Sequence, residues 1–441
     1  MNQRIKAFLG KQRFLLKEYL VHTFSKRNKV ISKQDIRDSQ SFCILPWIHL
    51  HVLPNSDVLP CCDSYYDDPY GNLKESSISN VWNNKKFKNM RKKFSQDKKV
   101  YGCRRCYETE ESGIKSMRLR VNKDFEHYHK LVSDMDSSGG IENPKLKYFD
   151  MRLSNVCNFK CRGCSPVLST SWYEDYERLW DLKLKTPKLE NVLKNNLTVK
   201  EEISTLLPEV ETIYFAGGEP LITDEHYEII TELIRIKKTE VNLDYNTNLS
   251  TLKFKKYNIL EMWANFSKVK INISIDDIGA RGEYFRSGLN WNKFLENFKI
   301  LKEHRGNINT NVTCTISIFN IHRIPEIHTF LFENDLIRPD EFIFNTLLSP
   351  RVYRTQVLPS VKKRIVTRDL KNYLTQLNDR FPEINFDEFS ASMRNQIDFM
   401  NDKDLSNSLQ KFRTVTKKLD SMRSENFTQV YPELKTLFEE S

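Results

Sequence analysis

Three closely spaced cysteines behind a predicted strand constrain this chain more than any other feature. The spacing is Cys157-x-x-x-Cys161-x-x-Cys164, directly after the strand-like run Tyr148–Leu153. Three thiolates this close can hold three corners of a cubane iron–sulfur cluster and leave the fourth iron without a cysteine. A structural zinc site would instead close its shell with four ligands. The alternatives to a cluster are a zinc knuckle and chance spacing. The pattern favours a cluster whose open iron binds a small molecule.

A second motif follows about fifty residues later and is also suited to binding a small molecule. The run Glu211–Ala216 predicts a buried strand that leads into Gly217-Gly218-Glu219-Pro220. Two glycines let the backbone approach a ligand closely. The carboxylate of Glu219 can accept hydrogen bonds from an ammonium group.

Together, the two motifs resemble those of the radical S-adenosylmethionine (SAM) superfamily. The resemblance implies that the open iron chelates the amine and carboxylate of SAM, and that Gly217, Gly218 and Glu219 bind the cofactor, with Glu219 receiving its ammonium. One electron would then cleave SAM to methionine and a 5′-deoxyadenosyl radical, which takes hydrogen from the substrate. Many members carry an aromatic residue before the third cysteine, whereas this chain has Gly163. That departure removes a packing contact near the adenine and no cluster ligand.

Strands and helices alternate from residue 145 onward, which predicts a parallel sheet. We expect strands near 147–153, 211–216, 241–246, 269–275, 310–317 and 341–346. Helices fit near 164–184, 224–237, 252–265, 291–305 and 323–334, with 181–200 as an insertion. The predicted fold class is α/β: a partial (β/α)6 TIM-like barrel of the radical SAM type, with a small Cys-rich N-terminal domain and a C-terminal helical cap.

Polar side chains lie at the carboxyl ends of the predicted strands, where ligands bind on such sheets. Asn248 follows the third strand, and Ser274 and Asp276 share one face at the end of the fourth. The resemblance implies that Ser274 and Asp276 contact the ribose hydroxyls or the methionine carboxylate, and strand-end capping is the alternative for Asp276. Arg286 could pair with a carboxylate of cofactor or substrate, or be a surface cation.

A second group of cysteines precedes the barrel: Cys43, Cys61, Cys62, Cys103 and Cys106. The surrounding sequence resembles the Twitch and SPASM auxiliary-cluster modules of radical enzymes, which usually follow the barrel. The resemblance implies that Cys43, Cys61, Cys103 and Cys106 bind a further [4Fe-4S] cluster. Adjacent thiols of an extended strand point to opposite faces, so Cys62 is a neighbour or an alternate ligand. Spacing alone does not separate this cluster from a four-thiolate zinc site.

Three other residues that could bind metals have simpler interpretations. His49 and His51 share a strand face near this second group, and we expect a structural pair there. Cys314 lies in a predicted strand and is expected to be a buried, inert thiol.

These features divide the chain into four predicted regions. Residues 1–38 form a basic helical extension, and residues 39–125 a Twitch/SPASM-like auxiliary cluster domain. Residues 145–347 form the radical SAM core, and residues 348–441 a helical cap in which Leu370, Tyr373, Leu374 and Leu377 trace one apolar face.

Composition narrows the possible binding partners and the cellular compartment. The charge of +11 comes from Lys and Arg spread along the chain, which favours a solvated surface over nucleic-acid binding. No window approaches the ~20 apolar residues of a membrane span, and the N-terminus lacks the apolar core of a signal peptide. We therefore expect a cytoplasmic protein, in which cysteines serve as metal ligands rather than as disulfides.

The resulting hypothesis is a radical SAM enzyme with a [4Fe-4S] cluster, an auxiliary cluster and SAM. An electron donor such as flavodoxin or ferredoxin would reduce it. Enzymes resembling this pattern often modify ribosomal peptides or proteins, so a peptide substrate is the first expectation. A radical enzyme acting on a sugar or other small metabolite is the alternative, and a non-catalytic metal-binding scaffold is the second alternative.

Overall fold

The computed structural model of the protein describes residues 38–64, 68–111, 115–194, 196–304 and 306–439, together with Gln12 and Ile36. The predicted extension over residues 1–38 lies almost wholly outside this range. Within the described range, none of the helices has the length and apolar character needed to cross a lipid bilayer.

The chain divides into two compact units. The first contains the described residues up to Leu153, together with Asn191–Tyr214 and Ile236–Val241. The second contains Ser154–Glu190, Phe215–Arg235 and the residues from Asn242 onward. The three-cysteine motif therefore lies in the second unit, and the other cysteine group lies in the first.

The first unit joins the Cys-rich segment to the first strand of the predicted core. Strand β1 (His49–Val52) pairs in parallel with β4 (Tyr148–Met151), with His49 opposite Tyr148 and Val52 opposite Met151. On its other edge β1 pairs antiparallel with β2 (Asp57–Leu59), which pairs with β3 (Gly71–Asn72). The Cys-rich segment thus extends a sheet through main-chain hydrogen bonds.

Helices of the first unit enclose a core beside these strands. They include α3 (Leu45–Ile48), α4 (Ile78–Trp82), α5 (Lys85–Phe94), α6 (Arg104–Glu111), α7 (Met117–Asp124) and α9 (Leu197–Leu206). Buried Phe42, Trp47, Met90 and Phe94 form part of this core, and Cys43 and Cys61 belong to the same cluster of side chains. The second cysteine group is therefore set against a packed apolar layer.

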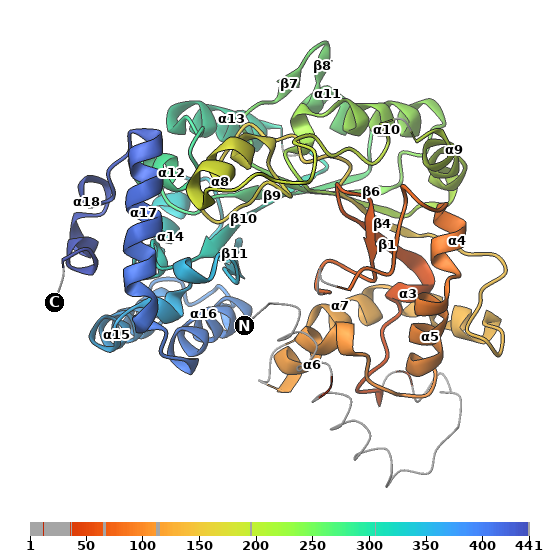
Figure 1. Ribbon diagram of the computed structural model, residues 1–441, viewed down its shortest axis with the longest axis horizontal. Helices are drawn as coiled ribbons and strands as arrows, with labels where there is room; N and C mark the ends of the chain where they lie inside the picture. The colour runs from red at the N-terminus through yellow and green to blue at the C-terminus, as the bar shows by residue number, and fades with distance from the viewer. Residues whose placement is uncertain are drawn as a thin grey trace, which may run out of the picture. The chain divides into compact units, whose positions relative to one another are not determined.

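The second unit contains four parallel strands in the order β11-β10-β9-β6, visible side by side in Figure 1. They are β6 (Asn242–Thr247), β9 (Lys268–Ser274), β10 (Ile308–Ile316) and β11 (Phe342–Thr346). Their burial alternates along β6 and β10, as expected for strands whose two faces differ in exposure. Strand β5 (Thr212–Phe215) crosses the boundary between the units.

The predicted alternation of strands and helices is confirmed, and the fold is a mixed α/β fold with a parallel sheet. The helices α10 (Asp224–Arg235), α13 (Trp291–Glu303) and α14 (Ile324–Glu333) follow the expected positions, and α12 (Gly279–Phe285) is an additional short helix. Two predicted helices are too long. In place of 164–184, α8 covers only Tyr173–Trp180.

The predicted helix over 252–265 is wrong in its first half. A two-stranded hairpin of β7 (Lys253–Phe254) and β8 (Tyr257–Asn258) precedes the short helix α11 (Ile259–Trp263). Lys255 has a positive φ of 53°, which a helix does not allow, and the Asn258 side chain caps α11 by accepting from the Leu260 amide.

The C-terminal region is helical as predicted. It contains α15 (Ser360–Arg380), α16 (Asp387–Asp402), α17 (Leu409–Arg423) and α18 (Phe427–Val430). The predicted apolar face of α15 is buried, at Leu370, Tyr373, Leu374 and Leu377. Helix α16 packs on β11, and α17 packs on α8, so this region is packed into the second unit.

Candidate functional site

The three-cysteine motif forms a compact loop in the second unit. The Cys164 amide donates to the Cys161 carbonyl at 2.9 Å, which closes a turn between two of the cysteines. Side chains outside the motif fix the same carbonyls: Ser171 Oγ donates to the Cys157 carbonyl at 2.7 Å, and Trp172 Nε1 to the Cys161 carbonyl at 2.7 Å. Sequence reasoning missed both of these hydrogen bonds, because nothing in the local pattern marks their direction.

All three thiols are half-buried and hold their protons strongly. Burial, followed by the neighbouring thiolate charges, raises the pKa of Cys157, and burial raises that of Cys161 to about 12. Burial also raises the pKa of Cys164. A thiol binds metal as the thiolate, so iron binding at these positions would release protons. The positive charge of the iron would offset the thiolate charges that burial disfavours.

The Gly-Gly-Glu motif is held directly against the residues that lead into the cysteine loop. The Gly218 amide donates to the Ser154 carbonyl at 3.0 Å, and the Glu219 amide donates to the Val156 carbonyl at 2.8 Å. A Cβ on Gly218 would lie 2.1 Å from the Val156 oxygen, and Gly217 has a φ of +116°. Only glycine fits both positions, so the two motifs are brought together by main-chain contact.

Glu219 places a carboxylate in a buried position beside this contact. Its side chain is 1% exposed and accepts from Thr247 Oγ1 at 2.7 Å, the Asn248 amide at 2.6 Å and the Leu221 amide at 3.1 Å. Burial raises its pKa to about 7, against the opposing effect of those hydrogen bonds and of the Arg286 charge. A buried carboxylate with a raised pKa gains from a cation, so an ammonium group suits this position.

Asn248 connects Glu219 to the cysteine loop. Its amide donates to Glu219, and its side-chain Nδ2 donates to Asn158 Oδ1 at 3.0 Å, between the first two cysteines. Its own Oδ1 accepts from the Ser250 amide at 2.9 Å. The structure therefore brings this predicted residue to the site through interactions within the chain.

Asp276 and Arg286 form a buried ion pair next to Cys161, the second cysteine of the motif. Arg286 Nη2 lies 2.8 Å from Asp276 Oδ2, and Arg286 Nη1 donates to Cys161 Sγ at 3.9 Å. The other Asp276 oxygen accepts from the Thr315 amide at 2.8 Å. Arg286 Nε is buried and, within the described part of the chain, makes no hydrogen bond. A carboxylate ligand would supply the missing acceptor.

Ser274 and Gly163 complete the predicted positions of this site. Ser274 ends β9 opposite Thr313 of β10 and is half-buried. Beside Gly163, an added Cβ would lie 2.8 Å from Leu347 Cδ1 and 3.4 Å from Phe285 Cζ. These two apolar side chains occupy the space next to Gly163.

The second cysteine group lies in the first unit. Cys43, Cys61 and Cys106 are buried, and Cys103 is half-buried. Burial raises the pKa of each of the four, to about 12 for Cys43, and the thiols also act on one another: Cys106 on Cys43, and Cys43 and Cys106 on Cys103. Cys103 in turn acts on Cys61. These mutual effects join all four thiols into one electrostatic group.

Cys62 has different neighbours. Its sulfur lies 3.7 Å from Met117 Sδ, and after burial the charge of Asp150 contributes most to its raised pKa. The adjacent Cys61 instead contacts Ser64 Oγ at 3.5 Å. The two neighbouring thiols thus face different surroundings.

His49 and His51 lie on β1 and are fully buried. His51 Nδ1 lies 2.8 Å from Asp150 Oδ2, and His49 Nδ1 lies 3.0 Å from the Tyr148 carbonyl oxygen. Burial lowers the pKa of His49 to about 4, so that imidazole is neutral at ordinary pH. Throughout the described ranges, no three cysteine, histidine or carboxylate side chains converge on the space of a single metal ion.

Comparison with known sequences identifies two domains. Residues 151–331 match the Radical SAM superfamily, and residues 43–107 match SPASM, an iron-sulfur cluster-binding domain. A GTP 3′,8-cyclase of Helicobacter pylori (strain J99) is 30% identical over 137 residues, which are 31% of this chain and 36% of that protein. A GTP 3′,8-cyclase of Microcystis aeruginosa is 29% identical over 140 residues, 30% of this chain and 36% of that protein. The chain spans about a third of the length of these curated relatives.

Among solved structures, native anSMEcpe with bound AdoMet is 19% identical, with a TM-score of 0.37 over 52% of this chain and 60% of that one. Streptococcus suis SuiB bound to precursor peptide SuiA is 15% identical, with a TM-score of 0.34 over 63% and 60% of the two chains.

Proposed function

The chain carries a radical SAM domain at residues 151–331, behind an iron–sulfur cluster-binding domain at residues 43–107, and from this premise we propose that it is a radical SAM enzyme acting on a peptide or protein. Cys157, Cys161 and Cys164 hold a [4Fe-4S] cluster through three of its irons. With one electron from a reduced donor, the bound cluster and SAM would supply methionine and a 5′-deoxyadenosyl radical able to abstract hydrogen from the substrate.

The protein residues around that cluster bind and orient the cofactor. Glu219 receives the ammonium group of SAM, because its buried carboxylate is stabilised by a cation. Arg286 receives the carboxylate through its free Nε. Asn248 and Asp276 hold these two groups in place, and Ser274 lies at the strand end where the ribose would bind. Gly217 and Gly218 let the backbone pass close to the cofactor.

The first unit carries an auxiliary [4Fe-4S] cluster on Cys43, Cys61, Cys103 and Cys106. Support comes from the match to an iron-sulfur cluster-binding domain and from the mutual electrostatic effects of these thiols. Cys62 is a neighbour of this cluster rather than a ligand, because it faces Met117 and Asp150.

The proposed regions are 39–125 for the auxiliary domain, 145–347 for the radical SAM core and 348–441 for the helical cap. The predicted core of residues 145–347 includes β4 together with β6, β9, β10 and β11. In the structure β4 belongs to the first compact unit, where it pairs with β1. A flavodoxin or ferredoxin is the proposed electron donor.

The observation that carries the proposal is the pair of main-chain hydrogen bonds joining the cysteine loop to the Gly-Gly-Glu motif, at Gly218 and Glu219. They hold the loop with the three cysteines next to a buried carboxylate. The test is anaerobic reconstitution with iron and sulfide, followed by reduction with dithionite in the presence of SAM. We expect 5′-deoxyadenosine from the wild type and none from a C157S/C161S/C164S variant. A cluster-replete wild type without this product would refute the enzymatic proposal.

Metal analysis of the same samples tests the two-cluster assignment. Two [4Fe-4S] clusters require about eight irons per chain, whereas one cluster and one zinc require about four irons. The C157S/C161S/C164S variant should retain about four irons, all in the auxiliary cluster. Loss of every iron from that variant would contradict the proposed division of ligands.

A second candidate is a radical enzyme acting on a small metabolite, and the GTP 3′,8-cyclase relatives favour it. Incubation of the reduced enzyme with SAM and GTP distinguishes the candidates. Consumption of GTP together with 5′-deoxyadenosine formation would support the second candidate. A mass change in a short peptide encoded beside the gene and coexpressed with the enzyme would support the first.

A further inference from the structure

A buried arginine inside the cysteine motif is held by residues near the C-terminal end of the described chain. Arg162 lies between Cys161 and Cys164, and its side chain is fully buried. Its Nη2 contacts Asp420 Oδ1 and Glu425 Oε2, each at 2.5 Å. Its guanidinium also lies 3.8 Å from the centre of the Tyr284 ring. The motif is thus tied to α17 and to the turn that follows it.

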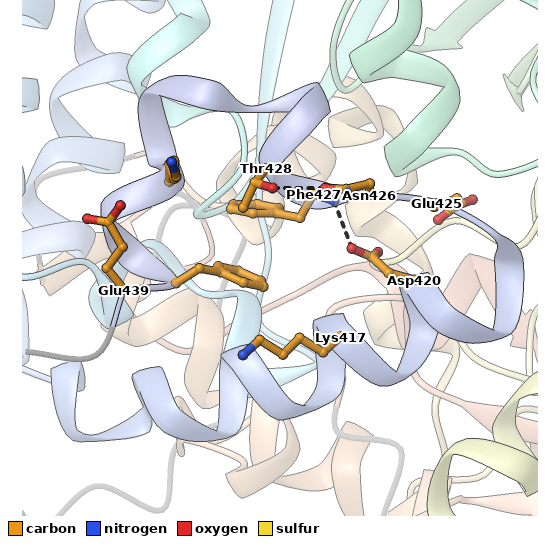
Figure 2. Close-up of a pocket in the computed structure, with 9 residues that line it drawn as sticks. Lys417, Asp420, Glu425, Asn426, Phe427, Thr428 and Glu439 are labelled. Atoms are coloured by element: carbon orange, nitrogen blue, oxygen red, sulfur yellow. Dashed lines mark hydrogen bonds between the residues drawn. The ribbon is translucent and has the colours of Figure 1, made fainter.

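The Asp420 carboxylate is itself fixed in position. Asp420 Oδ1 accepts from the Tyr284 hydroxyl at 2.7 Å, and Asp420 Oδ2 accepts from the Phe427 amide at 2.8 Å. Figure 2 shows this second hydrogen bond, with Asp420 on the helix and Glu425 on the turn beyond it. Ser424 between them has a positive φ of 55°, and its amide closes the helix end. Asp420 and Glu425 therefore face Arg162 from a rigid helix terminus.

A second ion pair ties α17 to the residues that follow the motif. Arg423 Nε lies 2.8 Å from Asp175 Oδ2, and Lys160 Nζ lies 3.1 Å from the same oxygen. The Arg423 guanidinium stacks 4.6 Å from the Trp172 ring, and Trp172 donates to the Cys161 carbonyl. Arg162 thus links the motif to α17, and Arg423 links α17 to the residues that follow the motif.

Such a network suits positioning better than it suits stability. Buried ion pairs lose much of their attraction to desolvation, so an apolar contact would stabilise the fold at least as well. Charged, multiply hydrogen-bonded contacts instead allow few geometries. Arg162 Nε donates to the Tyr284 carbonyl at 3.3 Å, and its Nη2 contacts Asp420.

We propose that Arg162 is a positioning residue, and that Asp420 and Glu425 clamp the cysteine loop in its cluster-binding shape through it. That the loop binds a cluster rests on the proposed function. The clamp itself rests on the ion pairs alone. The clamp predicts that loosening α17 releases the loop, although α17 supplies no ligand.

The test compares R162Q, D420N and E425Q with a matched control, E433Q. Glu433 also lies near the C-terminal end and pairs with an arginine, Arg323, at 2.6 Å, in contacts that do not involve the cysteine loop. Hydrogen–deuterium exchange of the metal-free protein is followed in the peptide covering residues 157–171. We expect roughly tenfold faster exchange in R162Q and D420N, with no change in E433Q. Unchanged exchange in both R162Q and D420N would overturn the clamp, whether or not the wild type binds iron.

Reconstituted protein provides the second measurement. A chelator should remove iron from the Cys157 site of D420N and E425Q roughly tenfold faster than from wild type, while the auxiliary cluster of the same molecules stays intact. R162K should restore part of the retention that R162Q loses, because it keeps the charge. Equal loss from both clusters, or from E433Q, would indicate general destabilisation and refute a positioning role. If the C157S/C161S/C164S variant binds as much iron as the wild type, the proposed function is refuted instead. The hydrogen–deuterium exchange result would still decide whether the clamp exists.

Discussion

Replacing Gly218 by alanine should separate the two motifs of the proposed active site. The new Cβ would lie 2.1 Å from the Val156 carbonyl oxygen and 2.6 Å from its carbon, both well short of ordinary contact at 3.4 Å. Both are backbone atoms, so no side-chain rotation relieves the clash. Overpacking of this kind costs about 1–3 kcal/mol, and loss of the hydrogen bond from Glu219 to Val156 adds about 0.5–1.5 kcal/mol. We expect the free energy of unfolding to fall by roughly 2–4 kcal/mol, which for a chain of 441 residues is a fall in the midpoint of roughly 2–4 °C.

Two other glycines provide matched controls. Gly163→Ala meets the end of the Leu347 side chain at 2.8 Å and Phe285 Cζ at the ordinary distance of 3.4 Å, and Gly306→Ala meets no atom within 4 Å among the described residues. These variants should lose about 1 kcal/mol or less. The assay is thermal unfolding of the metal-free proteins, followed by iron analysis after reconstitution. Gly218→Ala should keep the auxiliary iron and lose the iron of the cysteine loop. Stability and iron content equal to those of the two controls would refute the contact on which the site is built.

Other predictions follow from single side chains. The folded pKa of Glu219, about 7, exceeds its ordinary 4.5, so the metal-free fold should lose roughly 2–4 kcal/mol as pH rises between these values, and E219Q should abolish this fall in denaturant titrations. By the same ionisation, wild-type SAM affinity should increase as pH rises through about 7, and a pH-independent affinity in calorimetry would contradict the assigned role. C61S should lose about four irons per chain while C62S keeps them, and iron loss from C62S would make that thiol a ligand. Gly163→Phe should unfold at lower temperature than Gly163→Ala, because Phe285 and Leu347 already fill the adjacent space; equal midpoints would show that the space is open.

The meeting of the two motifs could be predicted from the sequence. Each motif directly follows a predicted strand, and the carboxyl ends of neighbouring parallel strands meet at one edge of a sheet. The apolar face of α15 was also predictable, because Leu370, Tyr373, Leu374 and Leu377, all of them buried, repeat at helical spacing.

The surroundings of Asp276 were not predictable from alternation. Strand β9 ends at Ser274, so Asp276 lies beyond the last residue to which the two-residue period applies. Its carboxylate is 2% exposed and paired with Arg286, ten residues later along the chain. The hairpin at β7 and β8 was missed because its turn depends on a left-handed Lys255, a residue type that carries no turn signal.

The partners of Arg162 were beyond sequence reasoning altogether. No local period connects it to Asp420 or Glu425, since tertiary packing of α17 alone sets those distances. A lone arginine between two cysteines gives no indication of which carboxylate it will meet.

The same separation determines when the loop can be completed during synthesis. Arg162 precedes Asp420 by 258 residues and Glu425 by 263. A ribosome adds about 5–20 residues per second, so on the order of ten to fifty seconds pass between translation of the arginine and of its partners. Throughout that interval the nascent cysteine loop lacks its two carboxylates. Iron delivered to the growing chain would meet an unclamped loop, so maturation of this centre belongs after translation of residue 425.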